Sequence, residues 1–182
     1  PGYVDQMVFA PADAPGDGVD SDAIERPSVA RQRRTRTPQP AARPTRCGAK
    51  RAGATRSVGA ATGGRLVHGC LLPRKGLGYV RRNRAGWGTE ELVGLVQWAA
   101  GAVARLYHGT VPVVVGALSA ETGGRLRGHR SHQSGRDIDI GFFASDNQAL
   151  PHFRRMHAGN LDVVKSWSLI GALLSSGQVQ YI

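Results

Sequence analysis

The fold of this chain is most constrained by a short segment in which acidic and branched apolar residues alternate. Asp137 and Asp139 alternate with Ile138 and Ile140. Successive side chains of a β-strand point to opposite faces, so the two carboxylates would share one face and the isoleucines would be buried on the other. The alternation therefore predicts a strand over residues 136–143 whose first half presents acidic side chains.

A polar loop that contains glycine and two histidines leads into this strand. His129 and His132 precede Gly135, and a glycine permits the positive φ that could fold an imidazole back over the carboxylates. A histidine nitrogen facing a carboxylate oxygen would form half of a zinc site. Polar residues in such a loop also serve turn formation and hydrogen bonding. Spacing alone chooses neither between these two interpretations nor between Asp137 and Asp139 as a ligand.

The sequence of the loop and strand resembles that of a peptidase family. The run S-H-Q-S-G-R-D-I-D is similar to the S-H-x-x-G-x-x-x-D signature of zinc peptidases related to D-Ala-D-Ala metallopeptidases, lysostaphin and hedgehog. The longer string G-H-R-S-H-Q-S-G-R-D-I-D-I resembles the penicillin-insensitive murein endopeptidases, and the resemblance runs from about residue 64 to residue 182. In that family the carboxylate ligand lies seven residues after the first histidine. The resemblance therefore implies that His132 and Asp139 are metal ligands and that His129 belongs to the active site. Ser131 and Asp137 are candidates to orient His132 or neighbouring loop amides by hydrogen bonds.

The resemblance also implies a reaction, a cofactor and a location. Enzymes of this family use Zn²⁺ and water to hydrolyse peptide cross-links of peptidoglycan, so we expect a metallopeptidase of the periplasm or cell envelope that cleaves D-alanyl–diaminopimelyl cross-links. The family takes its third ligand and its general base from a downstream H-x-H pair, which this sequence does not contain up to Ile182. The alternative is an inactive, truncated pseudoenzyme or a wall-binding domain with an incomplete zinc shell.

Basic residues are in large excess, and the formal net charge of +11 calls for a polyanionic partner or surface. Residues 31–56 hold nine Arg or Lys and no acid, which predicts a disordered tail over 1–62, acidic and then Arg-rich, before a domain over 63–182. Nucleic-acid binding is not expected, because no aromatic residues interleave with the arginines. Four further arginines surround the histidine motif, where they could attract carboxylates of wall peptides or form a solvated rim: Arg125, Arg127, Arg130 and Arg136. The sequence assigns no substrate-binding residue and no oligomeric state.

The two cysteines, Cys47 and Cys70, do not form a C-x-x-C pair, which argues against a thiolate zinc site. They could form one disulfide in an exported protein. Because Cys47 falls in the predicted tail, we favour two unpaired thiols. No apolar run is long enough to span a bilayer, and no signal peptide is visible, although the chain begins at Pro1 and not at Met.

Apolar periodicity predicts an α+β fold with a central, mostly antiparallel sheet flanked by helices. Strands are expected over 66–73 and 111–118, besides 136–143, with another beginning at 178. A helix over 89–106 would begin at the N-cap Thr89. A second helix over 161–176 would have Asn160 as its cap and these residues facing inward: Val164, Trp167, Leu173 and Leu174. The connection 144–160 is expected to be a loop in which His152 and His157 are solvated.

Overall fold

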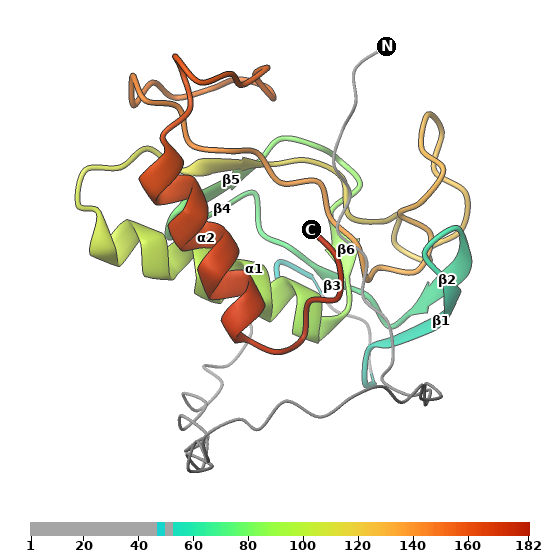
Figure 1. The fold of residues 1–182 in the computed structure, drawn as a ribbon. Coiled ribbons are helices and arrows are strands. Elements are labelled where there is room, and N and C mark those ends of the chain that lie inside the picture. The colour runs from blue at the N-terminus through green and yellow to red at the C-terminus, as the bar shows by residue number, and fades with distance from the viewer. Residues whose placement is uncertain (1–46, 50–52) are drawn as a thin grey trace, which may run out of the picture.

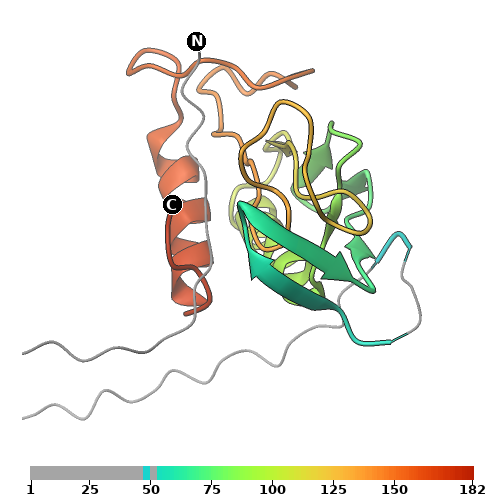
Figure 2. The ribbon, with the colours of Figure 1, turned by 90° about the vertical axis from the view of Figure 1, so that its right-hand side faces the viewer.

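A computed structural model describes residues 47–49 and 53–182 of the protein. The remainder of the predicted N-terminal tail, residues 1–46 and 50–52, lies outside the described residues. The described chain combines short strands with two helices, and strand pairing is antiparallel apart from one parallel pair, so the predicted α+β class is confirmed. The hairpin of β1 (Arg56–Ala60) and β2 (Gly63–Val67) lies on the opposite side of the domain from helix α2 (Val163–Ser175) in Figure 1, and Figure 2 shows the domain from the side of the hairpin.

The strands form three small sheets and not one continuous central sheet. The first is the β1–β2 hairpin, the second pairs β3 with β6, and the third has the order β4-β5-β7, in which β5 and β7 are parallel. Glycines and prolines interrupt this part of the chain and keep the strands short. The strand bounds are Arg56–Ala60 (β1), Gly63–Val67 (β2), Cys70–Leu71 (β3), Lys75–Gly76 (β4), Tyr79–Arg81 (β5), Trp87–Gly88 (β6) and Val113–Val115 (β7).

Helix α1 (Glu90–Leu106) forms the centre of the hydrophobic core, as the sequence predicts. The Thr89 side chain accepts a hydrogen bond from the backbone N–H of Leu92, which confirms the predicted N-cap. The buried face of the helix packs with β5, β7 and α2 in one apolar cluster. Burial of this face, and not helix propensity, accounts for most of the stability of such a helix.

Helix α2 begins later and faces differently from the prediction. Asp162, and not Asn160, is its N-cap and accepts from the N–H of Lys165. Only Leu173 of the predicted inward residues is buried; the other three are exposed on the outer face of the helix: Val164, Trp167 and Leu174. Apolar residues occur all around this helix, so their periodicity does not identify the face that packs.

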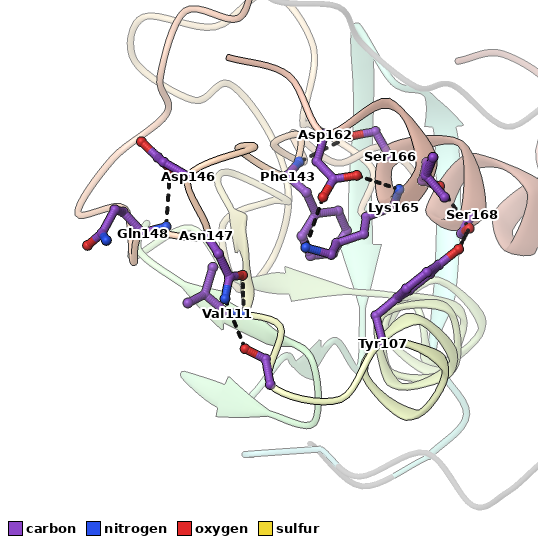
Figure 3. Close-up of polar contacts among 12 residues, drawn as sticks. Tyr107, Val111, Phe143, Asp146, Asn147, Gln148, Asp162, Lys165, Ser166 and Ser168 are labelled. Carbon is purple, nitrogen blue, oxygen red and sulfur yellow. Dashed lines mark hydrogen bonds and ion pairs between the residues drawn. The ribbon is translucent and has the colours of Figure 1, made fainter. Parts of the chain in front are cut away.

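Polar contacts connect α2 to α1 and to the segment before it (Figure 3). The Tyr107 hydroxyl lies 2.8 Å from the Ser168 hydroxyl, and the N–H of Phe143 donates to Ser166 Oγ at 3.2 Å. Asn147 Oδ1 accepts from the N–H of Val111 at 3.1 Å. The Asn147 contact ties the start of the predicted loop 144–160 to the segment before β7.

The segment predicted as a strand over 136–143 lies beside β7, but only isolated bridges form there. The N–H of Gly116 donates to the carbonyl of Asp139, and the N–H of Asp139 donates to the carbonyl of Ala117. One antiparallel bridge joins Val115 to Ile140. The prediction of a regular strand is therefore too strong, although the alignment of the segment with the sheet is as expected. The predicted strand after residue 178 is also absent from the described structure.

Two predictions about the N-terminal region are corrected. Strand β1 (Arg56–Ala60) lies inside the predicted tail 1–62, so the ordered part of the chain begins before Gly63. Cys47 and Cys70 form a disulfide, where unpaired thiols were favoured. The bond joins Cys47 to buried β3 across a separation of 23 residues, a long-range contact that local sequence composition does not reveal.

Candidate metal centre

The histidine loop projects from a base that is fixed by backbone hydrogen bonds. The N–H of Gly124 donates to the carbonyl of Gln133 at 2.9 Å, and the N–H of Gln133 donates to Ala61 in the β1–β2 turn at 3.0 Å. Gly123 has a φ of +72°, and a Cβ there would lie 2.3 Å from the Gln133 carbonyl oxygen. Only glycine fits at this position, because a side chain would clash with the Gln133 carbonyl. Gly123 therefore lets the two ends of the loop approach each other.

At the end of the loop the chain adopts a conformation that aims the His132 side chain inward. His132 has a φ of +64°, a left-handed conformation that is uncommon for a non-glycine residue. Its backbone N–H donates to Asp137 Oδ2 at 2.8 Å, which stabilises the turn. Gly135 has a φ of +71°, as the sequence predicts, and its carbonyl accepts from the N–H of Thr89 at the start of α1. The turn thus places the imidazole over both carboxylates.

The two nitrogens of the His132 ring face two different carboxylates. Nε2 lies 3.1 Å from Asp139 Oδ1, and Nδ1 lies 3.0 Å from Asp137 Oδ2, without hydrogen-bond geometry on the Nδ1 side. His132 and Asp137 are fully buried, and Asp139 is nearly so. Burial by itself lowers the pKa of His132, but the two carboxylates outweigh it and raise this pKa to about 10.

His129 lies next to the pair of His132 and Asp139 and forms a cluster with it. The His129 and His132 rings meet edge to face with centroids 4.9 Å apart. One potential ligand atom from each of His129, His132 and Asp139 lies within 4.8 Å of the other two. His129 is half-buried, and therefore accessible, whereas the other two side chains are buried.

The pair of His132 and Asp139 fits the donor set and spacing of a zinc site. Nitrogen and oxygen ligands bind tetrahedral zinc at about 2.0–2.2 Å, which separates two ligand atoms by roughly 3.3 Å. The observed separation of 3.1 Å is close to this value. Asp137 lies beside the other ring nitrogen, Nδ1. A carboxylate at this position orients a metal-binding histidine and increases its basicity.

The other residues singled out in the sequence differ in their burial and in their contacts. Ser131 is buried, but its hydroxyl has no hydrogen-bond partner among the described residues. Arg136 donates to the carbonyl of Gly59 in β1 at 2.9 Å and so braces the site from outside. His152 and His157 are exposed in the loop 144–160.

One residue beside the site gives no signal in the sequence. A Cβ on Gly116 would lie 2.6 Å from Phe153 Cζ and 3.0 Å from Asp139 Cβ, so the Phe153 ring covers Gly116 next to the carboxylate. The ring is 44% exposed. Phe153 lies in an irregular segment that has no periodicity, and only the fold brings it to Gly116.

Comparison with known proteins assigns the chain to a family. The model of the family of penicillin-insensitive murein endopeptidases matches residues 57–172. The chain belongs to this family, which is one of peptidases acting on peptidoglycan. The matched region contains the whole cluster of His129, His132 and Asp139. A search among curated proteins finds no match for the chain.

Proposed function

We propose that this protein is a zinc-dependent endopeptidase that hydrolyses D-alanyl–diaminopimelyl cross-links of peptidoglycan. The observation that carries the proposal is the 3.1 Å approach of His132 Nε2 to Asp139 Oδ1 in a buried turn. A neutral imidazole nitrogen and a carboxylate oxygen held at this spacing, inside a region that matches a murein endopeptidase family, can bind a metal ion together.

Each residue of the cluster has a distinct part in this proposal. His132 and Asp139 would hold the zinc, and Asp137 would fix the tautomer and orientation of His132 from Nδ1. His129 would act in catalysis by steadying water or substrate from the accessible side. The Ser131 hydroxyl would orient His132 or a neighbouring loop amide, a role that its burial without a described partner leaves available.

Zinc in such a site supplies Lewis acidity for the scissile carbonyl and a water that ionises near neutral pH. The protein's own contribution is a rigid and buried ligand pair, with the accessible His129 beside it. Hydrolysis of this kind needs no nucleophilic serine, so a β-lactam, which acylates such a serine, would not inhibit the enzyme.

The periplasm or cell envelope is the proposed location. The family acts on peptidoglycan. The Cys47–Cys70 disulfide supports this location independently, since structural disulfides persist in oxidising compartments. No helix in the described part of the chain is long and apolar enough to cross a membrane.

The test uses purified peptide dimers that carry one D-alanyl–diaminopimelyl cross-link. The zinc-loaded protein should convert them to monomers, and a chelator should stop the reaction until zinc is restored. His132→Ala and Asp139→Ala should abolish cleavage, whereas His152→Ala, which changes an exposed loop histidine, should not. Dimers that stay intact with zinc-loaded protein would contradict the proposal, and binding without cleavage would favour the wall-binding alternative.

A further inference from the structure

A basic hollow lies directly beside the candidate metal centre. It has a volume of about 570 Å³ and is lined by Arg125, Leu126, Arg127, Gly128, His129 and Arg130. Three of these six residues are arginines, and none is acidic. All three arginines are exposed. The hollow is therefore a strongly cationic surface that is open to solvent.

His129 belongs to both the hollow and the metal cluster. An anion bound in the hollow would consequently lie beside His129 of the metal cluster. The loop is fixed at its base by the Gly124–Gln133 hydrogen bond, and a turn from His129 N–H to the Leu126 carbonyl shapes its tip. These hydrogen bonds fix the base and the tip of the loop that carries the arginines.

Among the described residues, the three guanidinium groups are left open to a ligand. Within residues 47–49 and 53–182, no carboxylate or carbonyl group pairs with the side chain of Arg125, Arg127 or Arg130. Arg136, by contrast, is engaged with β1, and Arg154 is paired with Asp146. A guanidinium binds a carboxylate through two parallel hydrogen bonds, which makes arginine the residue suited to recognise that group.

We propose that the loop 125–130 binds the free carboxylate of the diaminopimelyl residue whose amide nitrogen is cleaved. This inference rests on the proposed function. In that cross-link the scissile nitrogen is attached to the carbon that carries the carboxylate, so the anion lies next to the bond being cut. Arginines beside the metal centre would therefore position the substrate and discriminate against cross-links in which this carboxylate is amidated or missing.

The experiment compares two dimers that differ only in this group, one with the free carboxylate and one with its primary amide. We expect the wild type to favour the acid by at least about tenfold in kcat/KM, the effect of one charge-assisted hydrogen bond. The triple variant Arg125→Gln, Arg127→Gln, Arg130→Gln should cleave both dimers with equal kcat/KM. Arg105→Gln, an exposed arginine at the end of α1, should keep the wild-type preference.

A second measurement does not depend on catalysis. Calorimetry with zinc-free protein should show that a peptide carrying the free carboxylate binds at least about tenfold more tightly than its amide, and that the triple variant loses this difference. If neither dimer is cleaved but the binding difference is present, the proposed function fails and the carboxylate site stands. Equal cleavage of both dimers by the wild type would overturn the carboxylate site while leaving the proposed function intact. Binding that follows total negative charge, with polyphosphate competing as well as the peptide, would also overturn it.

Discussion

The substitution Asp137→Asn tests whether the second carboxylate supports the candidate metal ligand. Asp137 is fully buried, and its Oδ2 both accepts the backbone N–H of His132 at 2.8 Å and lies 3.0 Å from Nδ1 of the ring. Asparagine has nearly the same shape, and its carbonyl oxygen can still accept the backbone hydrogen bond. What it removes is the negative charge on the far side of the imidazole.

The expected loss is a factor of 10–100 in zinc affinity, the usual effect of removing a group that orients a metal-binding histidine. This corresponds to about 1.4–2.7 kcal/mol. Asp139→Asn, which changes a proposed ligand, should cost more. Asp146→Asn should cost nothing, because Asp146 is an exposed carboxylate paired with Arg154 on the surface.

Zinc affinity would be measured by competition with a chelator of known affinity, at two or more pH values. Several pH values are needed because Asp137 also helps to raise the pKa of His132 to about 10 in the metal-free protein. The variant should therefore release the ring proton more easily, which offsets part of the loss at low pH and little of it at high pH. An unchanged affinity at the highest pH would refute the assigned role of Asp137.

Three further predictions concern stability and packing. Cys47→Ala removes the disulfide and should lower the free energy of unfolding by about 3 kcal/mol, and an unaltered denaturation midpoint would contradict this. Gly116→Ala places a Cβ 3.0 Å from Asp139 Cβ and closer still to the Phe153 ring. This variant should destabilise the fold by about 1–3 kcal/mol and weaken zinc binding. The control Gly171→Ala on α2, where a Cβ would have no atom within 4 Å, should leave stability unchanged or increase it. In the metal-free protein the pKa of His132 is raised above 6.5 to about 10. The contribution of His132 to stability is therefore complete below pH 6.5 and is lost as the pH rises to about 10. Denaturant unfolding across this pH range should show the decline in stability, and a flat profile would exclude this contribution.

The sequence predicted the structure correctly where interactions between residues close in the chain determine it. The apolar repeat and the cap at Thr89 identified α1 because both depend on residues three or four positions apart. Gly135 predicted the turn before the acidic segment, because a glycine locally permits a positive φ. The resemblance, and not spacing, favoured Asp139 over Asp137 as a ligand. In the structure the two carboxylates face opposite nitrogens of His132.

Contacts between distant residues were decided only by the tertiary structure. The sequence did not predict the Cys47–Cys70 bond, the Phe153 ring over Gly116, or the outward position of Trp167. Each depends on which surfaces meet when the helices and sheets pack. The pattern of apolar and polar residues within one segment does not reveal which other segment it packs against. The sequence by itself thus determined the chemistry of the histidine loop, while packing against β1, β7 and α1 determined which of its atoms face one another.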